Sequence, residues 1–265
     1  MAAESAVEMV RLGFTALKFD PAGPYTMRGG HHPSMYDIEK SVEFCRAIRD
    51  AVGTKADLLF GTHGQFNTAG AIRLGRRLEA FDPLWFEEPI PPDNLLEFQN
   101  VAKQVRIPIA TGERMTTKAE FSTVLRTGGA SILQPALGRS GGILETKKIA
   151  AIGEVYNAQI APHLYAGPVE WAANIQLAAN IPNLLLVETI LTGGDFHLKL
   201  IKNSIKWEDG FIIAPTEPGL GISFDEQVAL DNPYNGKELH LQMSEEGCDY
   251  QNKNDFLGGA PPRKH

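Results

Sequence analysis

The feature that most constrains the fold of this chain is a series of short apolar segments that end at a nearly constant interval. The segments are LLFGTHGQ (58–65), LWFEEP (84–89), IPIATGER (107–114), ILQPALGR (132–139), QIAPHL (159–164) and LLLVET (184–189). Successive strand ends are 26, 26, 23, 27 and 25 residues apart, counted from Gly61 through Glu87, Glu113, Ala136 and His163 to Glu188. Such a length holds a strand, a loop, a helix and a return loop. Repeated βα units predict an α/β barrel whose strands are parallel.

Polar side chains follow several of these segments. Because parallel strands point the same way, their carboxyl ends share one rim, and Glu87, Glu113, His163 and Glu188 should face one small volume. Carboxylates beside a histidine are typical of a divalent cation and of proton transfer. Glu87 is preferred over Glu88 as a ligand, because only one of two consecutive strand residues points inward.

Length and composition limit the remaining possibilities. A chain of 265 residues fits one large domain, and 43% hydrophobic residues are ample for a core. The net charge of −7 disfavours nucleic acid as a partner. No apolar window is long enough for a membrane span, and AAESAVEMVRLGF (2–14) predicts an amphipathic helix rather than a signal peptide. We therefore expect a cytoplasmic protein whose Cys45 and Cys248 are reduced thiols.

The beginning of the chain departs from the expected barrel pattern. A helix comes first and TALKF (15–19) is the first strand, whereas a closed barrel should open with a strand. We therefore expect that the first barrel strand is missing and that the chain is a fragment. The predicted organisation is a barrel domain over 1–195, a hairpin segment over 196–234 and a polar tail over 235–265. The hairpin is indicated by IKWEDGFIIAPTEPGLGI (205–222), with a turn at Asp209-Gly210.

Three further side chains are candidates for proton transfer. His163 ends a predicted strand, which favours a role as base or acid over a purely structural one. His63 lies beside Gly64 on the rim, and both roles stay open for it. Lys18 lies one residue from the end of its strand, where it is either a partly desolvated base or a surface lysine.

Several motifs occur in an order and spacing that resemble one family. They are FEEP (86–89), TGER (111–114), QP-x-x-x-R-x-GGI (134–143), APH (161–163), PHLYAGPVEWAANIQLAA (162–179) and PGLGI (218–222). Together they resemble the mandelate racemase branch of the enolase superfamily, and most closely its acid-sugar dehydratases, such as the galactonate dehydratases. The resemblance covers roughly residues 5–225.

The resemblance implies a fold and a reaction. The fold is a TIM-type (β/α)₇β barrel, which in this family is closed by an N-terminal α+β capping domain. The reaction is a dehydration, in which Mg²⁺ on three acidic strand ends holds the carboxylate of a small-molecule sugar acid. A base removes the α-proton, and an acid expels the β-hydroxyl.

The resemblance also assigns roles to individual residues. Glu87 and Glu113 match two metal ligands. His163 matches the base after the seventh strand, and His63 matches the acid of the galactonate dehydratases. Glu188 matches the acid at the eighth strand.

The chain departs from the family pattern at several places. Gly61 stands where the first metal ligand is normally Asp, and Ala136 stands where an Asp normally orients the histidine. The usual lysine pair reads Lys18-Phe19-Asp20, and Asp20 could supply the missing carboxylate. As a fourth departure, we expect the capping domain and the first strand to be missing, which would expose two barrel edges and favour aggregation or a homo-oligomer.

Two rival functions follow from these departures. Gly61, Ala136 and the expected absence of the capping domain favour a non-catalytic pseudoenzyme or an inactive fragment. Lys18 and His163 on opposite faces of a substrate would suit a racemase or epimerase of a 2-hydroxy acid. The dehydratase is preferred because His63 offers an acid for the leaving group. The sequence leaves the particular sugar acid open.

Overall fold

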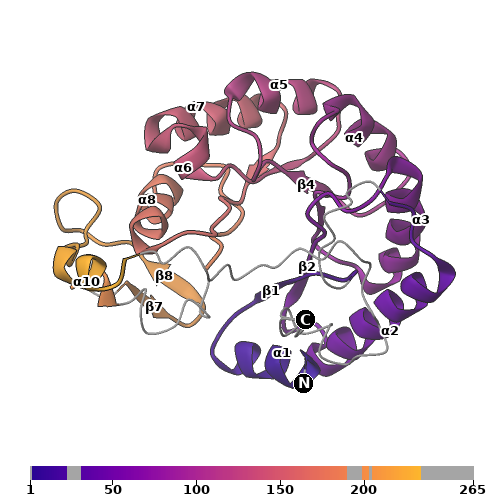
Figure 1. Ribbon diagram of the computed structural model, residues 1–265, viewed down its shortest axis with the longest axis horizontal. Helices are drawn as coiled ribbons and strands as arrows, with labels where there is room; N and C mark the ends of the chain where they lie inside the picture. Colours follow the sequence, from indigo (N-terminus) through magenta and orange to yellow (C-terminus); the bar gives the residue numbers. More distant parts are fainter. Residues whose placement is uncertain (1, 23–30, 190–198, 203–204, 234–265) are drawn as a thin grey trace. The chain divides into compact units, whose positions relative to one another are not determined.

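Parallel strands alternate with helices along the chain, which confirms the predicted α/β barrel topology. The computed structural model describes residues 2–22, 31–189, 199–202 and 205–233 (Figure 1). The six parallel strands pair in consecutive order and are β1 (Ala16–Phe19), β2 (Asp57–Gly61), β3 (Trp85–Glu87), β4 (Ile109–Thr111), β5 (Ile132–Leu133) and β6 (Gln159–Ile160). A helix follows each strand, as the interval of about 25 residues requires.

The chain divides into two compact units. The first holds the described residues up to Ala110 together with Thr127–Ala130. The second holds Thr111–Arg126 and the described residues from Ser131 onward. The predicted tail over 235–265, which includes Cys248, lies outside the described residues.

In the first unit, helices cover the outer side of strands β1 to β3 (Figure 1). These helices are α1 (Ala2–Arg11), α2 (Met35–Val52), α3 (Thr68–Leu78) with the short 3₁₀ helix η1 (Glu79–Phe81), and α4 (Leu95–Ala102). The register aligns Lys18 with Leu59, and it aligns Glu87 with both Gly61 and Ala110. Because the strands are in register, the residues that follow them reach the same rim.

Local signals in the sequence account for the helix ends in this unit. Ser34 caps α2 and forms a capping box with Asp37, and Gly53 ends the helix with a positive φ of 57°. The Asn67 side chain accepts the N–H of Gly70 at the start of α3. The Cys45 thiol lies in α2 and is buried, and burial raises its pKa well above the usual range.

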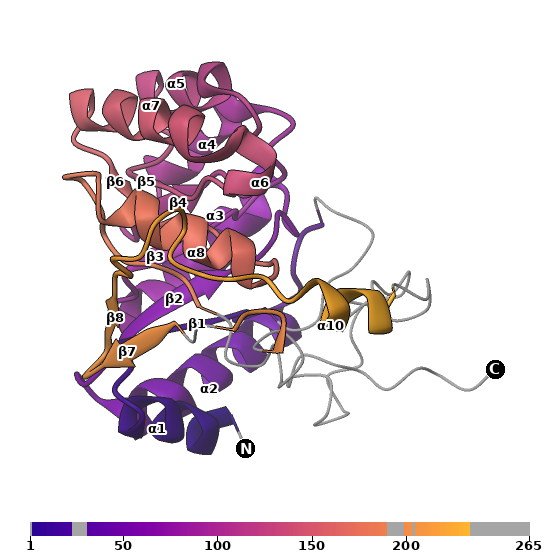
Figure 2. The same ribbon diagram turned by 90° about the vertical axis from the view of Figure 1, so that its left-hand side faces the viewer.

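The second unit continues the same alternation. Its helices are α5 (Lys118–Arg126), α6 (Leu137–Ser140), α7 (Gly142–Val155), α8 (Pro168–Ala178) and α10 (Glu226–Asp231). The single turn of α6 ends at Gly141, and helix α7 starts at the next residue, Gly142. The predicted hairpin is confirmed as β7 (Lys206–Glu208) and β8 (Phe211–Ile213) around Asp209 and Gly210, both at positive φ (Figure 2).

Apolar contacts hold this hairpin segment against helix α8 of the same unit. Trp171 and Ile175 of α8 form a buried cluster with Leu164, and Ile205 and Ile212 pack against it. The Gln176 side chain of α8 also donates to the backbone carbonyls of Pro215 and Leu220. The hairpin segment is therefore attached to the helix that follows β6.

One segment that was predicted as a strand forms only a single bridge. The segment 184–189 forms an isolated parallel bridge between Ile160 and Leu184 instead of a strand. The N–H of Ile160 donates to Asn183, and the N–H of Leu185 donates to Ile160. The next rung of this parallel ladder needs an N–H at position 162, and Pro162 has none. Proline in the neighbouring strand therefore ends the pairing before Glu188.

We predict that Gly112→Ala lowers the free energy of unfolding. Gly112 has a φ of 135°, and an added Cβ would lie 2.6 Å from the Phe121 ring and 3.1 Å from the backbone nitrogen of Gln134. Backbone strain and overpacking each cost about 1–3 kcal/mol, so a loss of at least ~2 kcal/mol is expected in urea unfolding. Gly128→Ala is the control, since its φ of 71° is also positive but nothing lies within 4 Å of the added Cβ. Equal losses for both variants would contradict the role of crowding by Phe121.

Candidate active site

A buried ion pair joins the ends of two strands in the first unit. Lys18 Nζ of β1 lies 2.7 Å from Glu87 Oε1 of β3. The Trp85 indole N–H donates to the other carboxylate oxygen of Glu87, over 3.0 Å. Glu87 is only 1% exposed, so its negative charge depends on these partners rather than on water. Lys18 is therefore a rim side chain directed at Glu87, and it is not a solvated surface lysine.

The glycine at position 61 makes room for this ion pair. A Cβ at Gly61 would lie 3.2 Å from Lys18 Cε, 3.7 Å from His63 Cε1 and 3.9 Å from Glu87 Cδ. Strand β2 lies between β1 and β3, so Lys18 reaches Glu87 across this position. Any side chain at position 61 would press against the stem of Lys18.

Asp20 and His63 lie close together on the same rim. The Asp20 carboxylate accepts the N–H of Ala22 over 2.7 Å and the side-chain amide of Gln65 over 2.8 Å. His63 Nδ1 lies 3.9 Å from Asp20 Oδ2, and His63 has a left-handed φ of 52°. Burial raises the pKa of Asp20 well above its usual range, and the nearby charge of Glu87 adds to this effect. Sequence reasoning missed Gln65, although GTHGQ (61–65) places an amide four residues after the strand end.

In the second unit, His163 lies among two carboxylates. His163 Nδ1 is 3.1 Å from Glu188 Oε2 and 3.5 Å from Glu113 Oε2. The backbone N–H of Leu164 donates to the same Glu188 oxygen over 2.7 Å. His163 and Glu113 are both buried, and their potential ligand atoms lie within 4.8 Å of one another. The predicted grouping of Glu113, His163 and Glu188 is therefore present in this unit.

Backbone hydrogen bonds fix His163 and Glu113 at the ends of their segments. The N–H of His163 donates to Pro135, and its carbonyl accepts the side-chain amide of Asn174. The Arg139 guanidinium donates to the carbonyl of Glu113. Neither Asn174 nor Arg139 was assigned a role from the sequence, although Arg139 belongs to the QP-x-x-x-R motif. They act on the main chain, which a residue pattern does not reveal.

Glu88 differs from the sequence-based expectation in one respect. Strand alternation predicted that one glutamate of the pair points inward, yet Glu87 and Glu88 are 1% and 0% exposed. Glu88 has a left-handed φ of 40°, which interrupts the regular alternation of the strand after Glu87. Burial alone therefore does not show which of the two carboxylates belongs to the site. The ion pair with Lys18 is the observation that assigns Glu87 to it.

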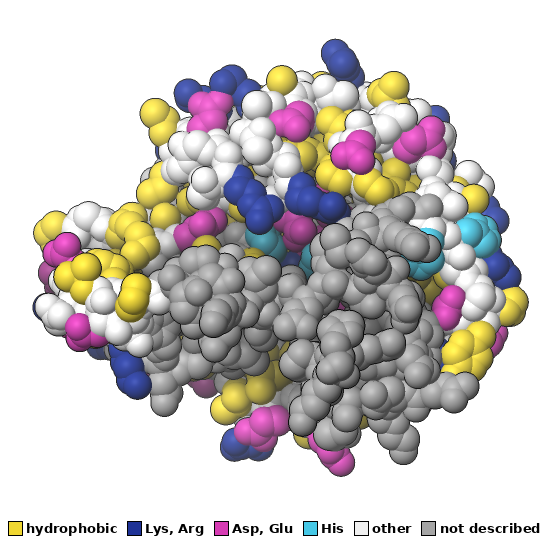
Figure 3. Space-filling model, viewed as in Figure 1, with side chains coloured by type: hydrophobic (Ala, Val, Ile, Leu, Met, Phe, Trp, Pro, Cys, Tyr) yellow, Lys and Arg dark blue, Asp and Glu magenta, His cyan; other side chains and the backbone are white. Residues whose placement is uncertain are grey.

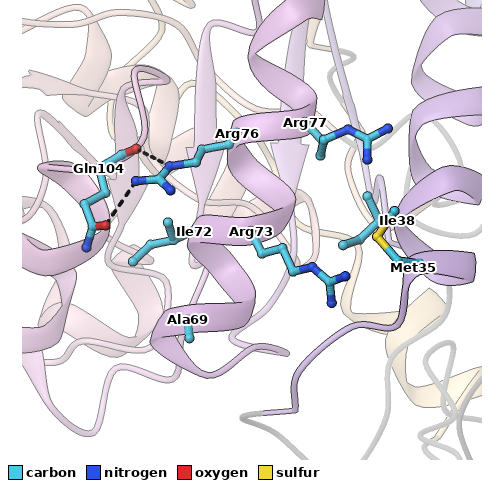
Figure 4. Close-up of a pocket in the computed structure, with 8 residues that line it drawn as sticks. All are labelled: Met35, Ile38, Ala69, Ile72, Arg73, Arg76, Arg77 and Gln104. Atoms are coloured by element: carbon cyan, nitrogen blue, oxygen red, sulfur yellow. Dashed lines mark hydrogen bonds between the residues drawn. The ribbon is translucent and has the colours of Figure 1, made fainter.

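A groove of about 480 Å³ lies beside helix α3 in the first unit, and its lining includes none of the rim residues described above (Figure 4). Its lining is Met35, Ile38, Ala69, Ile72, Arg73, Arg76, Arg77 and Gln104. The three arginines are engaged with neighbouring segments. Arg76 donates to Gln104, Arg77 pairs with Glu39, and Arg73 donates to the Pro33 carbonyl. These contacts connect α3 to the neighbouring segments. The arginine side chains of the groove therefore have partners within the protein.

The described surface is mixed in charge. On the face shown in Figure 3, acidic and basic side chains lie near one another. Exposed pairs such as Lys40 with Glu43 contribute to this mixture. Within the described ranges, the helices are all too short or too polar to cross a membrane.

The family of the chain follows from comparison with known proteins. Residues 1–228 match the family model described as enolase C-terminal domain-like. The chain belongs to this family. A mandelate racemase/muconate lactonizing enzyme from Sulfitobacter sp. has a solved structure that is 68% identical, with a TM-score of 0.89. That match covers 94% of this chain and 63% of the Sulfitobacter chain.

Curated relatives of this family member carry dehydratase names. The D-gluconate/D-galactonate dehydratase of Picrophilus torridus is 35% identical over 88% of this chain. The D-xylonate dehydratase of Haloferax volcanii is 35% identical over 89% of the chain. The matched regions make up 59% and 58% of these two relatives, so the chain spans somewhat more than half of their length.

Proposed function

We propose that this enolase-family domain catalyses the Mg²⁺-dependent dehydration of a sugar acid, an aldonate or an aldarate. The observation that supports it best is the buried histidine at the end of the β6 segment, held at 3.1 Å from the Glu188 carboxylate. Such a histidine can accept a proton from carbon at neutral pH. The dehydratase names of the curated relatives support the same reaction class.

The proposed steps use residues of this chain as base and acid. His163 removes the proton α to the substrate carboxylate, and the electron pair of the broken C–H bond moves into the enediolate. Collapse of the enediolate breaks the C–O bond to the β-hydroxyl, and His63 donates the proton with which it leaves as water. The resulting enol then takes up a proton at carbon to give a 2-keto-3-deoxy acid. Lys18 lies one residue before the end of a strand at the same rim as His63, and we assign it a contact with the substrate.

The donor atoms fit a hard divalent cation. Glu87, Glu113 and Asp20 would hold it, because carboxylate oxygens are the ligands that Mg²⁺ prefers. Glu113 follows three residues after Ala110, which pairs with Glu87, so the two glutamates end adjacent strands. A buried Glu87 requires a positive partner, and Lys18 provides one in the described structure. When bound, Mg²⁺ neutralises the substrate carboxylate and the charge that develops on it.

The proposal is tested with a panel of five- and six-carbon aldonic and aldaric acids in the presence of Mg²⁺. We expect 2-keto-3-deoxy product from at least one acid, and we expect EDTA to abolish its formation. A run in D₂O detects exchange of the α-proton independently of water loss. Exchange with inversion but no loss of water would identify a racemase or epimerase. The absence of both exchange and product across the panel would contradict the proposed function.

A further inference from the structure

Several hydrogen bonds connect the turn after β2 to the end of β3 in the first unit. The backbone N–H of Thr62 donates to the Glu87 carbonyl over 3.1 Å, and the N–H of Gly64 donates to the Glu88 carbonyl over 2.6 Å. The Thr62 hydroxyl donates to both carbonyls and lies 3.0 Å from each. Thr62 is 0% exposed, so these hydrogen bonds of its hydroxyl are shielded from water.

His63 lies in the turn that these hydrogen bonds hold. The N–H of Gln65 donates to the Thr62 carbonyl over 3.1 Å, and the two residues between them have positive φ angles, 52° at His63 and 70° at Gly64. This pair of angles is typical of a type I′ turn. Glycine adopts such a conformation readily, whereas histidine adopts it at a cost in free energy. The position of His63 therefore depends on the support of its neighbours.

The end of β3 is irregular at the same place. Glu88 has a left-handed φ of 40°, and its carbonyl accepts both the Thr62 hydroxyl and the Gly64 N–H. The N–H of Glu88 still donates to Ala110 of β4 over 2.9 Å. Two residues in costly backbone conformations, His63 and Glu88, are therefore connected through the side chain of Thr62.

We propose that Thr62 is the positioning residue of His63. Its hydroxyl fixes the turn to the main chain of Glu87 and Glu88, and so holds the His63 imidazole on the rim where the Glu87 carboxylate lies. No proton passes through Thr62, since its hydroxyl hydrogen is engaged by the two carbonyls. This assignment rests on the proposed function of His63 as the acid that protonates the leaving hydroxyl.

Gln65, at the other end of the turn, is less suited to this role. Its side-chain amide donates to Asp20 over 2.8 Å, so a change at position 65 acts directly on a proposed cation ligand. The Thr62 hydroxyl instead donates to main-chain carbonyls, those of Glu87 and Glu88. Each of these carbonyls also accepts a backbone N–H, so Thr62→Val leaves both of them with a partner.

The kinetic test separates the two proton transfers of the proposed reaction. Dehydration is followed by formation of the 2-keto-3-deoxy acid, and α-proton exchange by ¹H NMR of the substrate in D₂O. Thr62→Val should lower the kcat of dehydration by at least about tenfold, because a displaced acid slows the loss of water, whereas exchange, which depends on His163, should fall less than about threefold. The ratio of exchange to dehydration should therefore rise, whereas a general loss of structure would lower both rates together.

Further variants isolate the hydroxyl. Thr62→Ser keeps it and should retain the wild-type ratio. Thr146→Val is the matched control, because Thr146 is also 0% exposed and its hydroxyl donates to a backbone carbonyl, that of Gly142, over 2.9 Å. Thr146 lies on α7 in the second unit, and its substitution should leave the ratio unchanged. If Thr62→Val does not fold, the comparison of Thr62→Ala with Thr62→Ser tests the hydroxyl in its place.

A second measurement observes His63 without any reaction. The protein has seven histidines, and the ring signals of His63 in ¹H–¹³C NMR are identified by their loss in His63→Asn. We expect one set of His63 signals in the wild type, in Thr62→Ser and in Thr146→Val. We expect a second set in Thr62→Val, from molecules in which His63 has left the positive φ region.

Three results would overturn the proposal. They are an unchanged ratio in folded Thr62→Val, an equal fall of exchange and dehydration in that variant, and a ratio in Thr62→Ser that matches that of Thr62→Val. If the wild type dehydrates no acid, the proposed function fails, and the NMR measurement then decides the role of Thr62. In that case a single set of His63 signals in Thr62→Val would contradict the positioning role.

Discussion

His163→Asn is expected to lower the rate of α-proton exchange by about 10²–10⁴-fold, the range that a general base contributes. Asparagine fills a similar space but cannot accept a proton from carbon. Its amide can still meet Glu188, so the surrounding hydrogen bonds should persist. The exchange rate is measured by ¹H NMR of the substrate in D₂O, with the circular dichroism spectrum as a check of folding. Mg²⁺ binding, measured by calorimetry, should change little.

An exposed histidine provides the matched control for this prediction. His32 lies before α2 and is exposed, with Arg73 as its neighbour at 3.3 Å. His32→Asn should leave the exchange rate unchanged. Exchange by His163→Asn at the wild-type rate would show that the base is another residue, and Lys18 would then be the next candidate.

The parts of the fold that depend on periodicity were predictable from the sequence. The repeat of about 25 residues identified the parallel strands that follow the first one, and residues with capping side chains, Ser34 and Asn67, stand at the starts of α2 and α3. The segment 184–189 was predicted wrongly as a strand. Most of its residues are apolar, but a strand also needs backbone hydrogen bonds to the neighbouring β6 segment. Pro162 lacks the N–H that the next rung requires, and such a defect is visible only when the two segments are aligned.

The residues at the rim were predictable as a set, whereas their mutual contacts were not. The strand-end pattern indicated Glu113, His163 and Glu188, and the structure brings these three together. The pairing of Lys18 with Glu87 was not predicted, because it depends on the empty space over Gly61. A missing side chain leaves no signal in a single sequence about which neighbour uses the space.

Lys18→Met is expected to lower the free energy of unfolding by about 3–5 kcal/mol, the cost of removing one partner of a buried ion pair. The variant keeps the length and apolar stem of the side chain but leaves the Glu87 carboxylate, which is 1% exposed, without its ammonium. Urea unfolding at neutral pH measures the loss. Saturating Mg²⁺ should recover part of it, because a cation bound at Glu87 can take the place of the ammonium.

Two comparisons separate the buried charge from a general loss of packing. In Lys18→Met combined with Glu87→Gln, the uncompensated charge is absent, so most of the stability should return. Lys40→Met removes the more exposed pair with Glu43, whose atoms are 2.8 Å apart, close to the 2.7 Å of the Lys18–Glu87 pair, and it should cost less than about 1 kcal/mol. If Lys18→Met costs no more than Lys40→Met, the Glu87 charge is solvated, and the case for a positive partner at this strand end is lost. A large loss that the double variant recovers would show that the Glu87 carboxylate needs a cation, which is the property that the proposed metal site requires.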